Sequence, residues 1–191
     1  MTQPNTYVTI VSGLPRSGTS MMMRMLEVGG MPVLVDNIRV ADDDNPRGYY
    51  EFEPVKQTKR DASWVQQAPG KAVKLVYRLL YDLPADYQYR VLFMRRNLNE
   101  VLASQRKMLA RDGRGDDVDD GEMAALFRAE LAKFDAWVKK QPNFTLIDVQ
   151  YNELLSEPEP VIHRVAEFLD GSVDRESMAQ VVDKSLYRNR T

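Results

Sequence analysis

The sequence contains no cysteine and only one histidine, His163, among its 191 residues. Without cysteine the chain forms no disulfide, has no thiolate nucleophile and cannot ligate zinc through sulfur. A single histidine excludes a multi-histidine metal site and argues against a Ser-His-Asp triad. These two shortages remove most hydrolases and metalloenzymes from consideration.

Long apolar runs and an excess of one charge are missing as well. No stretch approaches the ~20 apolar residues that a membrane-spanning helix needs, and the first residues lack the basic and apolar regions of a signal peptide. We therefore expect a cytoplasmic protein without a membrane partner. Lys and Arg number 26 against 28 Asp and Glu, and the two signs are mixed along the chain. A nucleic-acid partner, which needs a broad basic face, is therefore not expected.

The hydrophobic pattern predicts a single α/β domain over residues 1–191, because this length suits one buried core. A β-branched run at 7–12 ends at Gly13 and precedes a helical pattern at 19–28. Further strands are expected at 32–35, 72–77, 90–94 and 144–149. Helical patterns or long connections separate them, as parallel strands require. We therefore expect three layers, with a central parallel sheet between helices.

Several helices are marked by their end signals and apolar spacing. Asn97 and Glu100 form a candidate capping box before an amphipathic helix. Apolar residues at 127, 131, 134 and 138 mark a second helix, and Pro158 and Pro160 lead into a third at 161–169. A shorter helix is expected at 54–65, and the glycine-rich segment 111–121 is expected to be a mobile surface loop. The methionines at 21, 22, 23 and 25 are expected to fill the core beneath the first helix.

The stretch Gly13-Leu-Pro-Arg-Ser-Gly-Thr-Ser20 lies between the first strand and its helix. At such a junction, backbone N–H groups and a helix N-terminus together form a cradle for an anion. Three hydroxyl groups and the guanidinium of Arg16 add donors, so we expect an anion to bind here. A nucleoside-triphosphatase P-loop reads G-x-x-x-x-G-K-[ST], and this sequence has Thr19 at the lysine position. Triphosphate chemistry therefore lacks its main cation.

The motif L-P-R-S-G-T-S resembles the 5′-phosphosulfate loop, P-[KR]-S-G-T-[ST], of sulfotransferases that use 3′-phosphoadenosine 5′-phosphosulfate (PAPS). A second stretch, R-N-L-N-E-V-L-A-S, is similar to that family's 3′-phosphate motif, in which an Arg after a strand and a Ser eight residues later bind the phosphate. Residues 45–51 and 151–169 also resemble family segments, so the likeness spans about residues 7–188.

The resemblance implies a PAPS-dependent sulfotransferase that needs no metal and sulfates a hydroxyl or amine of a small molecule or peptide. It assigns the donor to these residues: Pro15, Arg16, Ser17, Gly18, Thr19 and Ser20 for the 5′-phosphosulfate, with Arg96 and Ser104 for the 3′-phosphate. The family's C-terminal R-K-G-x-x-G-D-W segment has no counterpart, and Arg188 and Arg190 are the basic residues near that end.

The general base is the least defined part of the expected site. Many family members use a histidine, but His163 falls within the late helix and is expected at the surface. Glu51 is the first candidate for the base and Glu53 the second, because both follow two aromatics that suit an acceptor pocket. Alternatively, Glu51 only stabilises the N-terminus of the expected 54–65 helix through the helix dipole. Lys74 lies among apolar strand residues and needs either an edge position or a ligand. The resemblance favours the ligand, so Arg16, Glu51 and Lys74 are the candidate catalytic residues.

Two other functions remain open at this point. In a P-loop kinase, Ser20 would bind Mg²⁺ and Asp148, at the end of F-T-L-I-D, would act like a Walker-B acid. The other is a sulfotransferase-like nucleotide-binding protein without catalysis. The acidic runs 42–44 and 116–120 are expected to be solvated rather than to bind metal. The sequence carries no signal for the acceptor's identity or for an oligomeric state.

Overall fold

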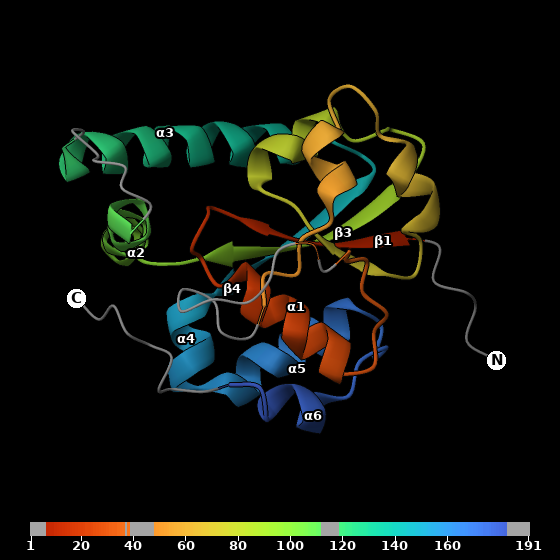
Figure 1. The fold of residues 1–191 in the computed structure, drawn as a ribbon. Helices are drawn as coiled ribbons and strands as arrows, with labels where there is room; N and C mark the ends of the chain where they lie inside the picture. Colours follow the sequence, from red (N-terminus) through yellow and green to blue (C-terminus); the bar gives the residue numbers. More distant parts are fainter. Residues whose placement is uncertain (1–6, 37, 39–47, 112–118, 183–191) are drawn as a thin grey trace.

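A four-stranded parallel sheet forms the centre of the molecule. The computed structural model describes residues 7–36, 38, 48–111 and 119–182. Figure 1 shows the sheet between two layers of helices. The strands are β1 (Tyr7–Gly13), β2 (Ala72–Lys74), β3 (Gln88–Arg95) and β4 (Phe144–Gln150), in the order β2-β1-β3-β4. The predicted three-layer α/β fold with a central parallel sheet is confirmed.

Side chains of the two inner strands, β1 and β3, point alternately to the two faces of the sheet and so contribute to two separate hydrophobic cores. In β3, Leu92 and Met94 contribute to one core, whereas Val91 and Phe93 contribute to the other. In β1, the buried hydroxyls of Thr9 and Ser12 take the place of further apolar groups. Because side chains of a strand point to opposite faces in turn, the inner strands of a sheet buried on both sides are apolar at most positions.

One face of the sheet is covered by α1 (Thr19–Val28), α4 (Tyr151–Ser156), α5 (Pro158–Phe168) and α6 (Arg175–Ala179), as Figure 1 shows. Met22, Met23 and Met25 of α1 are completely buried in this core. Their long, flexible side chains fill the space between the helix and the sheet, as expected from the sequence.

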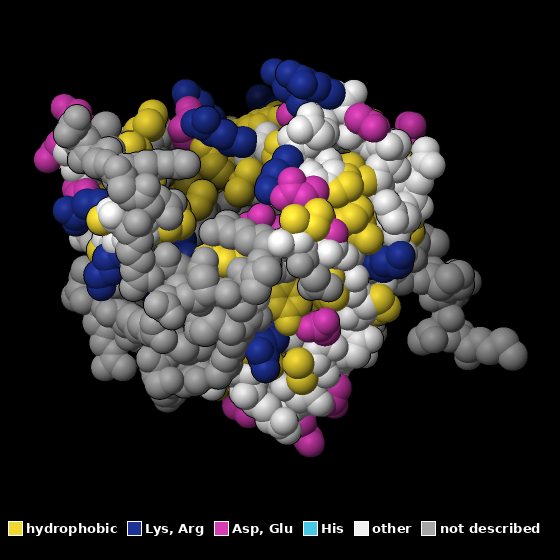
Figure 2. All heavy atoms as spheres, viewed as in Figure 1, with side chains coloured by type: hydrophobic (Ala, Val, Ile, Leu, Met, Phe, Trp, Pro, Cys, Tyr) yellow, Lys and Arg dark blue, Asp and Glu magenta, His cyan; other side chains and the backbone are white. Residues whose placement is uncertain are grey.

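The other face is covered by α3 (Asp120–Val138) and by three short 3₁₀ helices, η1 (Glu53–Gln57), η2 (Ser63–Gln67) and η3 (Tyr77–Asp82). Phe134 of α3 is at the centre of this core, stacked on Phe93 at 4.8 Å and edge-on to Tyr77 at 6.0 Å. Helix α2 (Leu98–Arg111) leads from the end of β3 towards α3. On the face of the molecule shown in Figure 2, basic and acidic side chains are interspersed, in keeping with their similar numbers in the sequence.

Four local predictions need correction. Residues 32–35 form a single bridge, Val33 to Ala72, rather than a strand, and the 72–77 strand ends at Lys74 because the chain turns into η3. The helix predicted at 54–65 is two 3₁₀ helices, since the Asp61 carboxylate accepts from the Ser63 N–H (2.9 Å) and turns the chain between them. The fourth correction concerns the capping box. Asn97 does accept from the Asn99 N–H, but Glu100 binds other partners, described below.

No helix in the described ranges combines the length and the apolarity that crossing a bilayer requires. The greater part of the predicted 111–121 loop, residues 42–44 and 116–118 of the acidic runs, and Arg188 and Arg190 lie outside the described residues.

Candidate functional site

The loop between β1 and α1 is a tight turn held by Ser17. The Ser17 hydroxyl donates to the Leu14 carbonyl at 2.7 Å, and the Ser17 N–H donates to the same oxygen at 3.3 Å. Ser17 is only 1% exposed, whereas Pro15 is at the surface. Arg16 has φ 68° and Gly18 has φ 98°, both in the left-handed region. Ser17 therefore gives the loop its shape, and its hydroxyl is engaged within the loop.

Two glycines allow the loop to approach its neighbours closely. A Cβ on Gly18 would lie 2.4 Å from Cδ2 of Tyr151, the first residue of α4. A Cβ on Gly13 would lie 2.7 Å from the Met94 carbonyl oxygen of β3. Both glycines also have positive φ, which other residues adopt only with strain. The loop is thus packed against the ends of β3 and β4 rather than projecting into solvent.

Helix α1 begins at Thr19, directly after the loop. Its N-cap residue is Gly18, which has no side chain to cap the first N–H groups, and the first turn contains no acidic residue. The N-terminus of a helix has unsatisfied N–H donors and a partial positive charge, and both favour an anion. The predicted phosphate cradle therefore lies at a helix N-terminus without a side-chain cap, and its role in binding an anion stays a prediction.

Arg96, which follows β3, joins this loop to α2 and α4. Its Nη1 donates to the Arg16 carbonyl at 3.0 Å, and its Nε donates to Glu100 Oε2 at 2.9 Å. Its guanidinium lies 4.4 Å from the centre of the Tyr151 ring. Burial raises the pKa of the Tyr151 hydroxyl, although the charge of Arg96 opposes that rise. Arg96 is 8% exposed and Glu100 2%, so this is a buried ion pair.

The carboxylate of Glu100 has a second partner in α4. Asn152 Nδ2 donates to Glu100 Oε1 at 2.9 Å, and the Asn97 N–H approaches Asn152 Oδ1 at 3.5 Å. Glu100 therefore orients Arg96 instead of closing the predicted capping box. The i, i+4 spacing of Arg96 and Glu100 is visible in the sequence and could have suggested this pairing, whereas the role of Asn152 depends on the position of α4.

Arg16 and Ser104 are brought together although 88 residues separate them. Arg16 Nε donates to Ser104 Oγ at 2.9 Å, and Ser104 is only 3% exposed on α2. The phosphate loop and the predicted 3′-phosphate pair therefore form one continuous polar group. We call the five residues of this group the arginine corner: Arg16, Arg96, Glu100, Ser104 and Asn152.

Lys74 is the last residue of β2 and lies far from the loop in the sequence. In the structure its side chain contacts the start of α1. Its ammonium donates to the Tyr49 carbonyl and lies 3.4 Å from Ser20 Oγ. Ser20 Oγ in turn donates to the Tyr49 carbonyl at 3.1 Å. The structure thus places Lys74 and Tyr49 beside Ser20 of the predicted donor loop.

Glu51 and His163 have separate surroundings. The Glu51 carboxylate lies 3.4 Å from Lys56 Nζ and its side chain is 19% exposed. His163 is 54% exposed on α5, with Nε2 at 3.2 Å from Glu167 and Nδ1 at 2.7 Å from Arg175. The expected surface position of the histidine is confirmed by this exposure, whereas the role of Glu51 as a base stays a prediction.

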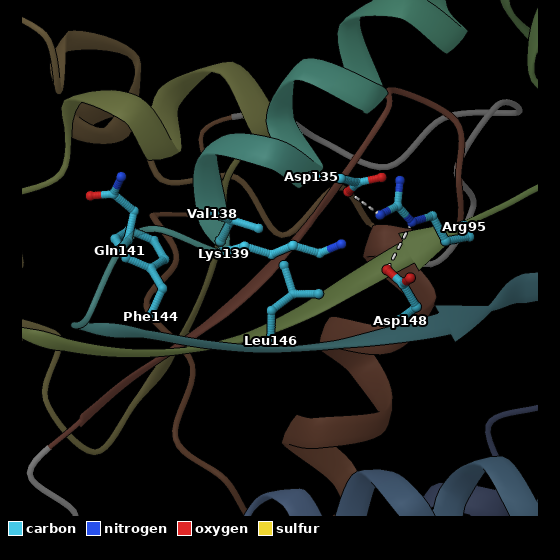
Figure 3. A pocket seen from close by; sticks show the side chains of 8 residues that line it. All are labelled: Arg95, Asp135, Val138, Lys139, Gln141, Phe144, Leu146 and Asp148. Carbon is cyan, nitrogen blue, oxygen red and sulfur yellow. Dashed lines mark hydrogen bonds and ion pairs between the residues drawn. The ribbon is translucent and has the colours of Figure 1, made fainter.

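Asp148, the acid of the kinase alternative, belongs to a different part of the molecule. It lies in a hollow of about 330 Å³ between β4 and α3, which Figure 3 shows. Arg95 Nε donates to Asp148 at 2.8 Å and Arg95 Nη2 to Asp135 at 2.5 Å. The carboxylate of Asp148 is therefore held in an ion pair across the sheet edge. Among the described residues, no three acidic or histidine side chains gather where they could hold a metal ion.

One family model matches the central part of the chain. Residues 88–175 match the model of the Sulfotransferase family, a range that begins at β3 and includes the Arg96 and Ser104 motif. No curated protein matches the chain. The described fold is similar to that of sulfotransferase STF9 from Mycobacterium avium, with 13% identity, a TM-score of 0.52 and coverage of 99% of this chain and 70% of that one.

Two further solved structures align over most of the chain. A sulfotransferase domain from the curacin biosynthetic pathway is 15% identical, with a TM-score of 0.49 and coverage of 97% of this chain and 92% of that one. A sugar kinase from Janibacter sp. HTCC2649 is 14% identical, with a TM-score of 0.44 and coverage of 95% and 98%. The family match bears out the expected resemblance to sulfotransferases over residues 88–175, and the STF9 structure bears out the fold.

Proposed function

We propose that this chain, which matches the sulfotransferase family over residues 88–175, transfers a sulfuryl group from PAPS to a hydroxyl or amine. The observation that supports the choice of donor is the contact between the two predicted donor motifs. Arg16 of the loop donates to Ser104, and its carbonyl accepts from Arg96. A donor with phosphate groups at both ends of its ribose needs two anion sites side by side, and this contact joins them.

In the proposed reaction, the acceptor oxygen or nitrogen attacks sulfur in line with the bond to the leaving 5′-phosphate oxygen. The new bond to sulfur forms as the old S–O bond breaks, the acceptor loses its proton, and 3′,5′-phosphoadenosine leaves with the electron pair. Negative charge grows on the leaving phosphate, so fixed N–H donors and cations around it lower the barrier. The N-terminus of α1 and the loop N–H groups would supply that stabilisation.

Lys74, beside the loop, and Glu51 are proposed as catalytic side chains. The Lys74 ammonium lies 3.4 Å from Ser20 Oγ, at the first turn of α1, where it would stabilise charge on the transferred group. Glu51 follows the Tyr49 and Tyr50 segment and would accept the proton of the acceptor. Burial, together with a 2.5 Å hydrogen bond to Glu27, raises the pKa of Tyr50, so its hydroxyl stays protonated.

Calorimetric titration with 3′,5′-phosphoadenosine and with ATP, each with and without Mg²⁺, tests the proposal. We expect 3′,5′-phosphoadenosine to bind without Mg²⁺ and to raise the melting temperature, because a ligand bound only by the folded state stabilises that state. Tight binding of ATP that requires Mg²⁺ would instead favour the kinase alternative. Transfer of radiolabelled sulfate from PAPS to a mixture of phenols, sugars and amines then distinguishes an enzyme from a binding protein.

A further inference from the structure

One face of α1 is joined to the segment Tyr49–Tyr50 at two points. Ser20, Arg24 and Glu27 share this face, because residues three and four apart in a helix lie above one another. Ser20 Oγ donates to the Tyr49 carbonyl at 3.1 Å, and the Tyr50 hydroxyl donates to Glu27 at 2.5 Å. The segment is therefore attached to α1 one turn before Arg24 and again one turn after it.

Arg24 is a partly buried cation that forms no ion pair with any described residue. Its Nε is shielded from solvent and has no hydrogen-bond partner in that part of the chain. Glu27 is the one acidic residue of α1, and its carboxylate accepts from Tyr50 instead of pairing with Arg24. Burial and Glu27 raise the pKa of the Tyr50 hydroxyl, and the nearby Arg24 charge opposes that rise. Buried donors in proteins are almost always satisfied, so this guanidinium would gain from a bound anion.

Arg24 lies on the Lys74 side of the proposed donor loop. The Lys74 ammonium is 3.4 Å from Ser20 Oγ, and Arg24 follows Ser20 by one helical turn, about 5 to 6 Å along α1. In the sheet, β1 separates β2, which ends at Lys74, from β3, which leads to Arg96. An anion at Arg24 would therefore lie across the loop from the arginine corner, where the acceptor rather than the 3′-phosphate of the donor is expected.

We propose that Arg24 binds an anionic group of the acceptor, so that the acceptor is a hydroxyl or amine compound that also carries a carboxylate, sulfate or phosphate group. The inference rests on the proposed function and deepens it, because it names the class of acceptor. A guanidinium forms charge-assisted hydrogen bonds with each of these oxyanions. Glu27 is held by Tyr50 and does not compete for Arg24, whereas Lys74, beside Ser20, is the cation for the transferred group.

The test compares acceptors in matched pairs, with PAPS as the donor. The pairs are 4-hydroxyphenylacetate with 4-hydroxyphenylacetamide, and glucuronate with glucuronamide, so the members of a pair differ in one charged group. Arg24→Met removes the charge and the donors but keeps a long side chain. Arg128→Met, at an exposed position of α3, is the matched control for the loss of a positive charge. Calorimetric titration of each protein, saturated with 3′,5′-phosphoadenosine, with the same compounds adds a measurement that does not depend on turnover.

We expect the natural protein to use the acid of a pair at least about tenfold better than its amide, measured as kcat/KM, which is the size of one charge-assisted contact. Arg24→Met should lower kcat/KM for the acid to the value for the amide, while the amide rate and the affinity for 3′,5′-phosphoadenosine stay the same. Arg128→Met should keep the natural preference. The melting temperature of Arg24→Met should equal or exceed that of the natural protein, because the shielded Nε has no hydrogen-bond partner among the described residues.

Equal use of acid and amide by the natural protein, or a preference that survives in Arg24→Met, overturns the inference and leaves the proposed function in place. Failure of the natural protein to bind 3′,5′-phosphoadenosine overturns both. If that nucleotide binds but no compound is sulfated, the titrations decide. Tighter binding of the acids that Arg24→Met abolishes supports the inference, and binding that does not distinguish acid from amide overturns it.

Circular dichroism shows whether each variant is folded. If Arg24→Met does not fold, Arg24→Gln, which keeps hydrogen-bonding groups without the charge, takes its place in the same comparison. If neither variant folds, the guanidinium is required by the fold itself, and the inference is overturned.

Discussion

Arg96 and Glu100 form an ion pair in which both side chains are almost completely removed from solvent, at 8% and 2% exposure. One partner of such a pair cannot be removed without leaving the other as an isolated buried charge, which is costly in a low-dielectric interior. Asn152 shares the Glu100 carboxylate, so the pair also connects α2 to α4. This pair has a structural consequence separate from any role in binding.

Arg96→Gln should lower the free energy of unfolding by about 3 to 5 kcal/mol, because Glu100 is left buried without its cation. The double variant Arg96→Gln with Glu100→Gln should recover a large part of that loss, since no unpaired charge remains. Urea denaturation of both single variants and the double variant gives the coupling energy directly. Additive losses would mean that the two charges do not stabilise each other.

Gly18→Ala should be far more destabilising than Gly30→Ala. Both glycines have similar φ values, 98° and 93°, so both substitutions introduce the same backbone strain. Only at Gly18 does the new Cβ meet another side chain, 2.4 Å from Tyr151, whereas the Cβ at Gly30 has no atom within 4 Å. We expect the free energy of unfolding to fall by about 1 to 3 kcal/mol for Gly30→Ala and by clearly more for Gly18→Ala. Gly18→Ala should also weaken nucleotide binding. Equal losses in urea denaturation would show that the loop yields to the methyl group.

Lys74→Met should reduce sulfuryl transfer roughly tenfold or more, with a smaller effect on the affinity for 3′,5′-phosphoadenosine. Methionine keeps the apolar stem of the lysine but lacks the ammonium that contacts Tyr49 and Ser20. Lys71→Met, three residues earlier, is the control for the loss of a positive charge near this strand. If both variants retain the natural turnover rate, Lys74 only anchors the Tyr49 segment.

Glu51→Gln should lower turnover roughly 10²-fold while nucleotide affinity stays the same, if this carboxylate accepts the acceptor's proton. His163→Ala should leave both quantities unchanged, because the histidine ring is bonded to Glu167 and Arg175 on the surface of α5. Initial rates with a saturating acceptor test the pair of variants. A large loss in the histidine variant together with normal rates in the Glu51 variant would contradict both assignments.

The sheet and its long helices could be predicted because their signals are local and repeated. Residues 7–12 and 90–94 are mostly apolar, interrupted by Thr9, Ser12 and Arg90, and both are fully or nearly buried inner strands. The strand predicted at 72–77 is longer than β2, because an apolar run does not reveal where a strand stops pairing with its neighbour. The predicted helix at 54–65 was wrong because the Asp61 turn competes with helical hydrogen bonds.

The predicted donor residues lie close together, but their partners could not be read from spacing. Glu100 was predicted to cap its helix and instead binds Arg96 and Asn152. Tyr151 lies close to Gly18 and Arg96 because it directly follows β4, and β4 is paired with β3 in the sheet. Contacts of this kind depend on how strands are ordered in the sheet, and strand order is not encoded in local periodicity.

The arginine corner also has a consequence for the order of folding. Its hydrogen bonds join residues 80, 88 and 52 positions apart in the chain. Such contacts form late, because closing long loops costs entropy before any contact is gained. The corner needs β1, β3 and the start of α4 to be in place at once, so a partly folded chain lacks the proposed binding site. A bound nucleotide should therefore slow amide hydrogen exchange throughout β3 and β4, and not only in the loop that it touches, because it is released whenever the strands separate.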